Sequence, residues 1–302
     1  MKERPGVLKS CLFGCLGLFG LFVLFLVIMA VLAGISMKDK RPMDTVLAPE
    51  ALAPKAVIAD AELSTIHPGR LILDVSQGEL IIKPARPGEQ LNVRVKYDAE
   101  VHEVVENYEV APDSSWVYEL RFHRTMPGMQ ALFRQIMAGG GDASVVVRIP
   151  ADLPVGLEIR LRQGGFEAEL GGLWLTHADI DYSQGGFALE FDEPVREPMD
   201  HLVIHGSMGG FGAAGLGNAS PRSLVVDCRM GGADIGLDGA WLQDCDIRLK
   251  VRMGGMDVRV PDNVVVQGVE TLPDDLELAP GEVPLPVLRF SIDQEMGEID
   301  VR

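Results

Sequence analysis

The chain has 302 residues, a formal net charge of −17 at pH 7 and a sequence pI near 4.7. So acidic a chain is unsuited to binding nucleic acid or to holding anionic lipid through a basic patch. The length allows one or two domains. The sequence contains no Cys-x-x-Cys pair, His-Glu-x-x-His motif or P-loop, so we expect neither a cofactor nor a metal.

A membrane anchor is predicted near the N-terminus. Residues Cys11 to Ile35 form a run of 25 residues without a charge. As a helix this run would be about 37 Å long, which is enough to cross a bilayer with some tilt. We therefore predict a tail at 1–10 and a transmembrane helix at 11–36. A signal peptide cleaved after Ala33 is the competing interpretation, although its apolar core would be unusually long.

The orientation of this helix is not decided by charge, because three Lys or Arg residues lie on each side of it. The short tail favours a cytoplasmic N-terminus, which would place the large domain outside the cytoplasmic membrane. Small residues at Cys11/Cys15 and Ala30/Gly34 hint at helix dimerisation, and so at a possible homo-oligomer. An Ala/Pro-rich linker is expected over residues 37–60.

From residue 61 to 302 the sequence predicts an all-β domain. Period-two runs such as RLILDV (70–75), ELIIK (79–83) and LNVRVKY (91–97) are typical of strands. VYELRFH (117–123), VVVRI (145–149), VLRFSI and EIDVR (298–302) continue the pattern.

One segment near 127–138 has helical spacing instead. Its apolar positions are Met129, Leu132, Phe133, Ile136 and Met137, and glycines follow at 139–141. This short amphipathic helix either caps an open end of the strand stack or offers a Met-rich surface to a partner.

Five glycine pairs recur at intervals of 21 to 24 residues, which is typical of a repeat architecture. They are Gly164/Gly165, Gly185/Gly186, Gly209/Gly210, Gly231/Gly232 and Gly254/Gly255. Less regular copies of the motif, with one glycine in place of the pair, occur after Gln77 and after Met296. On both sides of each pair, alternate positions are apolar and the intervening ones are mostly polar. Glycine has no side chain and permits unusual dihedrals, so each pair predicts a corner in the strand.

Stacked corners predict a parallel β-solenoid, or a closely related stacked-sheet prism. The Met or Gln before each pair is expected to line the inner corner, where flexible Met fills irregular space.

The strings VVVRIPADLPVGLEIRLRQGGFEAEL and VRMGGMDVRVPDNVVVQG resemble bacterial toastrack-type putative adhesins. They are also similar to the C-terminal domain of LiaF-type cell-wall antibiotic response proteins, which have several membrane helices where this chain has one. The resemblance covers roughly residues 65–302. It implies a stacked β fold, association with the bacterial cytoplasmic membrane and a role in envelope sensing or protein interaction. It supplies no catalytic residues.

One polar constellation merits testing. Alignment of the repeats places His205 between Asp181 and Asp227 on neighbouring coils, with Ser207 on the same face. Ser, His and Asp within reach of one another can be catalytic, but an exposed polar ladder explains the same residues. Cys228 and Cys245 fall within the repeats, and the sequence leaves open whether they pair.

These observations together predict a membrane-anchored, extracytoplasmic and non-catalytic module that binds a protein partner as a scaffold, sensor or adhesin-like domain. A self-assembling, bactofilin-like polymer is the first alternative. A carbohydrate-active β-helix enzyme is the second, and the short, even repeats speak against it.

Overall fold

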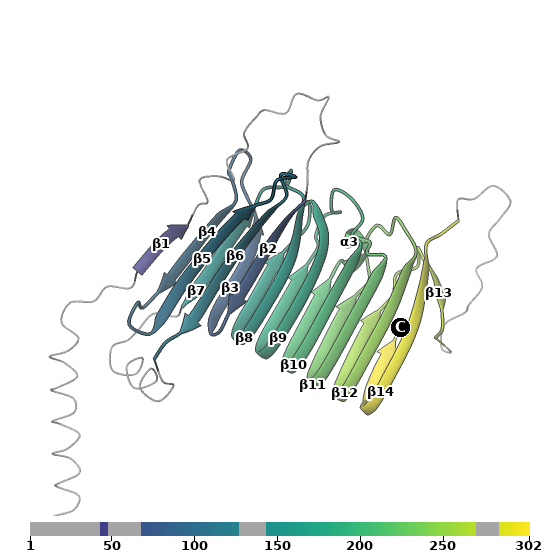
Figure 1. The fold of residues 1–302 in the computed structure, drawn as a ribbon. Coiled ribbons are helices and arrows are strands. Elements are labelled where there is room, and N and C mark those ends of the chain that lie inside the picture. The colour runs from purple at the N-terminus through teal and green to yellow at the C-terminus, as the bar shows by residue number, and fades with distance from the viewer. Residues whose placement is uncertain (1–42, 48–67, 127–142, 270–283) are drawn as a thin grey trace, which may run out of the picture. The chain divides into compact units, whose positions relative to one another are not determined.

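The computed structural model describes residues 43–47, 68–126, 143–269 and 284–302 (Figure 1). The predicted transmembrane helix at 11–36 and the inserted helix near 127–138, with its five apolar residues, lie outside these ranges. Among the described residues, no helix is both long and apolar enough to cross a membrane.

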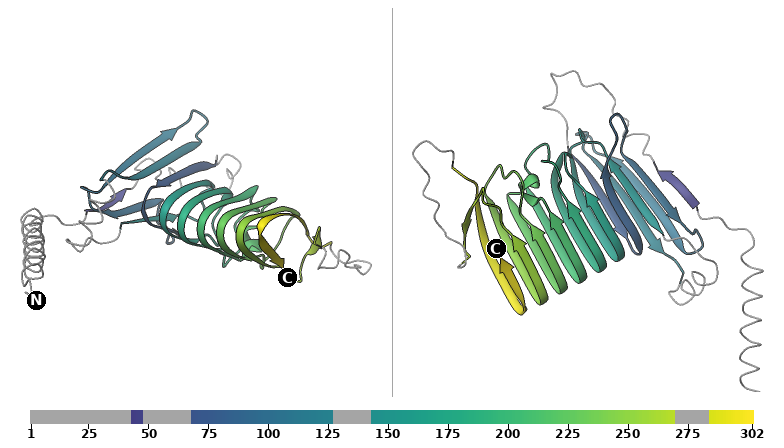
Figure 2. Two further views of the ribbon diagram at one scale, coloured as in Figure 1. Left: turned by 90° about the horizontal axis from the view of Figure 1, so that it is seen from below. Right: turned by 180° about the vertical axis from the view of Figure 1, so that it is seen from behind.

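Most of the described residues lie in β-strands and the only helix among them has four residues, which confirms the all-β prediction. Six long strands form a parallel ladder, and each continues through a bend (Figure 2). They are β8 (Val155–Glu169), β9 (Leu175–Glu190), β10 (His201–Ala214), β11 (Ser223–Gly236), β12 (Cys245–Arg259) and β14 (Val287–Val301). The short helix α3 (Leu216–Ala219) follows β10, and β13 (Val265–Gln267) pairs with the start of β14.

Two further rungs of the ladder are each made from two shorter strands. β2 (Gly69–Val75) and β3 (Gly78–Pro84) pair with the two halves of β8. β6 (Trp116–Arg124) and β7 (Ser144–Ile149) pair in turn with β2 and β3. In this rung β6 therefore ends, and β7 begins, at the position where the other rungs have their corner.

The N-terminal end of the stack departs from the parallel prediction. β4 (Asn92–Tyr97) and β5 (His102–Val110) run antiparallel to β7 and β6, because short connections join β4 to β5 and β5 to β6. β1 (Met43–Leu47) pairs antiparallel with β4, so the prediction of a linker throughout 37–60 is wrong at these residues.

The interior is a continuous column of apolar side chains. Ile159, Ile180, Ile204, Val226 and Leu249 occupy the same buried position in successive rungs. After the corner, Phe166, Phe187 and Phe211 stack in register, followed by Ala233 and Met256. Burying one face of every rung in this way stabilises the stack and fixes its register, because a slip of one residue would expose the whole set.

Candidate functional site

The corners form a single glycine column along the ladder. Gly78, Gly164, Gly185, Gly209, Gly231, Gly254 and Gly297 are in register from β3 to β14. The first glycine of each of the five pairs has φ between +131° and +146°, a region that L side chains rarely adopt. A bend in each strand requires such a conformation, and glycine adopts it without strain at Gly164, Gly185, Gly209, Gly231 and Gly254.

Close stacking gives a second reason for glycine at these five positions. A Cβ on any of them would lie only 1.7–2.0 Å from the carbonyl oxygen of the preceding glycine in the column. That oxygen belongs to the backbone of the neighbouring rung, so it cannot move aside without separating the rungs.

The second glycine of each pair does not meet the same restriction. A Cβ on Gly186, Gly210 or Gly255 would meet nothing within 4 Å, and one on Gly165 or Gly232 would make a contact only at 4.0 Å. The aligned positions on β3 and β14 hold Glu79 and Glu298. Neither steric contact nor a positive φ therefore requires glycine at the second position of each pair.

The residue before each pair faces solvent, so the prediction that it lines the inner corner is also wrong. Met208, Met230 and Met253 are 41–47% exposed, and Met296 is 71% exposed. Gln163 and Gln184 occupy the same column on β8 and β9 and are exposed as well. The positive φ of the following glycine turns the strand here, which places this side chain outside the bend.

The predicted polar constellation is a rung-to-rung column on the outer face. His205 pairs in register with Asp181 on one side and Asp227 on the other. The column continues with alternating basic and acidic residues over eight rungs, in the order Arg121, Asp74, Arg160, Asp181, His205, Asp227, Lys250 and Asp293. Lys250 forms an ion pair with Asp293, and this contact raises the pKa of the Lys250 ammonium group. Such cross-strand pairs stabilise a sheet modestly.

The geometry of this column supports the ladder interpretation over catalysis. Within the described part of the chain, no hydrogen bond or ion pair connects His205 with Asp181, Asp227 or Ser207. A nucleophile and its base need hydrogen-bond contact and an oriented third group. Ser207 also falls at the bend, where the paired register skips from Gly206 to Met208.

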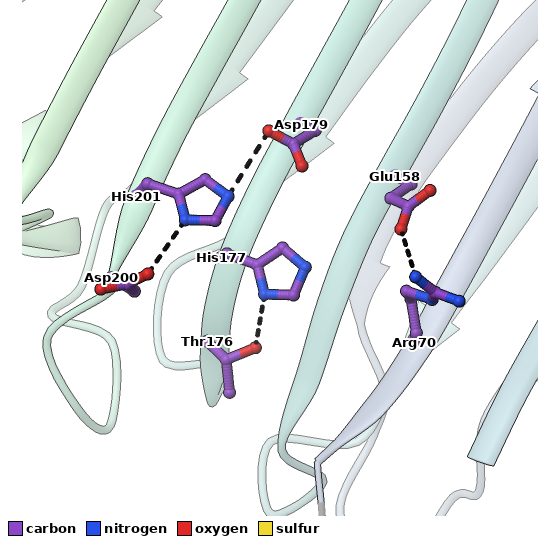
Figure 3. A network of polar contacts seen from close by, with 7 residues as sticks. All are labelled: Arg70, Glu158, Thr176, His177, Asp179, Asp200 and His201. Carbon is purple, nitrogen blue, oxygen red and sulfur yellow. Dashed lines mark hydrogen bonds and ion pairs between the residues drawn. The ribbon is translucent and has the colours of Figure 1, made fainter. Parts of the chain in front are cut away.

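A second group of polar residues, not predicted from the sequence, lies at the start of β9 and β10 (Figure 3). The imidazoles of His177 and His201 stack with their centroids 5.0 Å apart. His201 Nδ1 lies 3.1 Å from Asp200 Oδ2, and its Nε2 lies 3.5 Å from Asp179 Oδ1. His177 Nδ1 is 3.0 Å from Thr176 Oγ1.

His177 occupies the space that Gly156 leaves open on the neighbouring strand. A Cβ on Gly156 would lie 2.1 Å from the His177 ring. Desolvation by this packing is the main cause that lowers the pKa of His177, and the neighbouring His201 lowers it further. Trp116 over Gly69 and Tyr182 over Gly206 repeat the arrangement, so these glycines admit aromatic rings from adjacent strands. Within the described ranges, no three His, Cys, Asp or Glu side chains are grouped to hold a metal ion.

The two described cysteines do not pair. Cys228 and Cys245 are both buried free thiols. The register of β11 and β12 aligns Cys228 with Val251, six positions from Cys245, which separates the two cysteines by about 20 Å along the strand. Burial raises the pKa of both thiols, to about 12 for Cys245, so neither is suited to act as a nucleophile.

The string GFGAAG at 210–215 has the glycine spacing of a dinucleotide-binding loop. Here Gly210 and Gly212 lie inside β10, and the helix after Gly215 has only four residues. A pyrophosphate site needs these glycines in the turn that opens a longer helix. The string is therefore part of the ladder.

The last strand of the ladder, β14, has an open edge. β12 pairs with one side of β14 along Leu288–Val301, and β13 covers the other side only at residues 287–289. Beyond Arg289, no other strand among the described residues pairs with that side. The strand carries four exposed acidic side chains, Asp293, Glu295, Glu298 and Asp300.

The described residues thus define an all-β protein of stacked, mainly parallel strands with bent rungs. No family model matches the chain, and no curated protein matches it. Among solved structures, a "putative cell adhesion protein" from Clostridium sporogenes matches with a TM-score of 0.41 and 13% identity, covering 86% of this chain and 99% of that one. A "putative adhesin" from Bacteroides fragilis matches with a TM-score of 0.38 and 8% identity, covering 87% and 98%.

With TM-scores below 0.5, neither likeness bears on what this chain binds.

Proposed function

We propose that this chain is a non-catalytic binding and scaffold module of the bacterial envelope. The apolar run at 11–36 anchors it in the cytoplasmic membrane, and the β domain lies on the extracytoplasmic side. The observation that carries the proposal is the open edge of β14, because unpaired N–H and C=O groups can accept one more strand from a partner.

The chemistry of this edge favours an extended basic segment as the partner. Glu295 and Glu298 are exposed and form no ion pair with described residues, whereas Lys250 and Arg302 already approach Asp293 and Asp300. An added strand would place its side chains next to these carboxylates, where lysine and arginine are favoured and like charges are not.

Self-assembly is the second candidate, because the other end of the stack also has an open edge. Among the described strands, β5 pairs only with β6, and its exposed side chains include Glu103, Glu106 and Glu109. Joining β5 of one copy to β14 of the next would bring acidic residues against acidic residues. This repulsion favours a separate partner over a filament at physiological salt.

The proposal is tested in the native cell with a biotin ligase fused after Arg302, the residue that directly follows the end of β14. A cysteine placed at Asp262, an exposed position after β12, reports the side of the membrane. The proposal predicts labelling of Asp262→Cys by an impermeant maleimide in intact cells, with enrichment of a few envelope proteins. Labelling only after lysis would refute the extracytoplasmic location, and enrichment of this chain alone would favour self-assembly.

A further inference from the structure

Four methionines form an exposed column along the C-terminal half of the ladder. Met208, Met230, Met253 and Met296 are paired in register on β10, β11, β12 and β14. They account for half of the eight large apolar side chains that are exposed among the described residues. Each methionine directly precedes a glycine of the column at which the strands bend. The bends themselves are seen in Figure 2.

The fold does not require methionine in this column. Gln163 and Gln184 hold the same position on β8 and β9, before corners of the same geometry. An amide therefore suffices for the bend, and it exposes no apolar surface. A run of four thioethers in contact with water needs another explanation.

The spacing of the column suits a metal ion. Adjacent strands lie about 4.8 Å apart, so the backbones that carry two neighbouring Met side chains are separated by about that distance. Metal–sulfur bonds of roughly 2.3 Å place two sulfurs about 4.6 Å apart on opposite sides of an ion. The three rotatable bonds of methionine allow such an approach without movement of the backbone.

The ligand type selects the ion. Thioether sulfur is neutral and polarizable, and it favours soft ions such as copper(I) over zinc, calcium or magnesium. The nearby charges favour the C-terminal end of the column, because Glu295 and Glu298 flank Met296. Arg229 directly precedes Met230 and Arg252 directly precedes Met253, so both of these positions are less favourable for a cation than Met296. Met253 enters the site because it is the methionine paired in register with Met296.

We infer that Met253 and Met296, with Met230 beside them, form a binding site for a soft monovalent cation, copper(I) or its analogue silver(I). Binding would be a simple coordination step without a change of oxidation state. The buried thiols of Cys228 and Cys245 do not line this outer column.

The test is a titration of the full chain in detergent with silver nitrate in chloride-free buffer, followed by calorimetry and by the 13C-labelled methionine methyl signals. We expect saturable binding that shifts the signals of Met253 and Met296, assigned with single Met→Leu variants. The double variant Met253→Leu/Met296→Leu should weaken binding at least tenfold and keep its strand signal in circular dichroism. A matched pair of buried methionines, Met199→Leu/Met256→Leu, should bind silver as the unaltered chain does.

A gain-of-function variant gives an independent check. Gln163→Met/Gln184→Met extends the column by two thioethers, and we expect additional bound silver. The affinity for copper(I), measured by competition with a chromogenic chelator, should rank the variants in the same order as silver binding does. Binding that is unchanged in Met253→Leu/Met296→Leu, or no saturable binding in the unaltered chain, would overturn the inference.

Discussion

The two glycines of one corner should respond oppositely to the same substitution. In Gly231→Ala the new Cβ would lie 1.9 Å from the Gly209 carbonyl oxygen, at a residue with φ of +136°. In Gly232→Ala the nearest atom is the Gly255 carbonyl oxygen at 4.0 Å, and the φ is not in the positive region. The two variants differ by one position and add the same methyl group.

The magnitude follows from these distances. A strained backbone conformation alone costs about 1–3 kcal/mol, and the contact with the Gly209 oxygen forces two rungs apart. We expect Gly231→Ala to lower the free energy of unfolding by about 3 kcal/mol or more. In a domain of this size that corresponds to a fall in Tm of roughly 6–12 °C. Gly232→Ala should be neutral or stabilising by up to about 1 kcal/mol, because alanine restricts the unfolded chain.

The assay is thermal unfolding of the full chain in detergent, followed by the strand signal in circular dichroism. Gly209→Ala and Gly210→Ala, one rung away, provide a second pair with the same geometry. Equal Tm values for Gly231→Ala and Gly232→Ala would refute the assignment of the first glycine as the corner.

Three further predictions concern pH, salt and thiol chemistry. Burial lowers the pKa of His102 and His177 from the ordinary value of 6.5, so the unfolded chain takes up protons first as pH falls. Stability should therefore decrease below about pH 6.5, and His177→Gln should reduce the difference in Tm between pH 7.5 and 5.5; an unchanged difference would contradict the burial of this ring. The acidic edges of β5 and β14 should keep the chain from forming strand-paired filaments in 0.1 M salt. Association should increase near 1 M salt, because the repulsion between the edges is then screened. Filaments that light scattering detects at low salt and that disappear at high salt would contradict this prediction. Iodoacetamide should leave Cys228 and Cys245 unmodified until the protein is denatured, as read by peptide mass spectrometry, and rapid native labelling would contradict their burial.

The ladder could be predicted from the sequence because its signals are local and repeated. Period-two apolar positions around each glycine pair placed Ile180, Ile204 and Val226 in one buried column, and the structure buries all three. The same alignment placed His205 between Asp181 and Asp227, as the register confirms. A constant offset between repeats fixes which residues are neighbours, without knowledge of the path of the chain.

The parts that could not be predicted depend on direction and order in space. Strand β5, HEVVENYEV, buries none of its side chains fully, so it lacks the alternation that identifies a strand. Strands β2 and β3 lie between β8 and the later strands β6 and β7. The spacing of apolar residues within each strand does not encode this order. The outward direction of Met208 and Met230 follows from the positive φ of the next glycine, which apolar patterning does not encode.

The stacking of His177 with His201 was also missed, since it depends on the space above Gly156 on the neighbouring strand. Whether the helix near 127–138 caps the stack or meets a partner stays a prediction, because those residues lie outside the described ranges.

The most direct test of the proposed function is edge-dependent partner capture. Proximity labelling from Arg302 is compared between the unaltered chain and Glu295→Lys/Glu298→Lys, which reverses two unpaired charges on β14. Glu193→Lys/Glu197→Lys makes the same change of charge in the exposed segment between β9 and β10 and is the matched control. We expect the envelope proteins enriched by the unaltered chain to be lost with the β14 variant and kept with the control. Equal enrichment in all three would contradict binding at the open edge of β14.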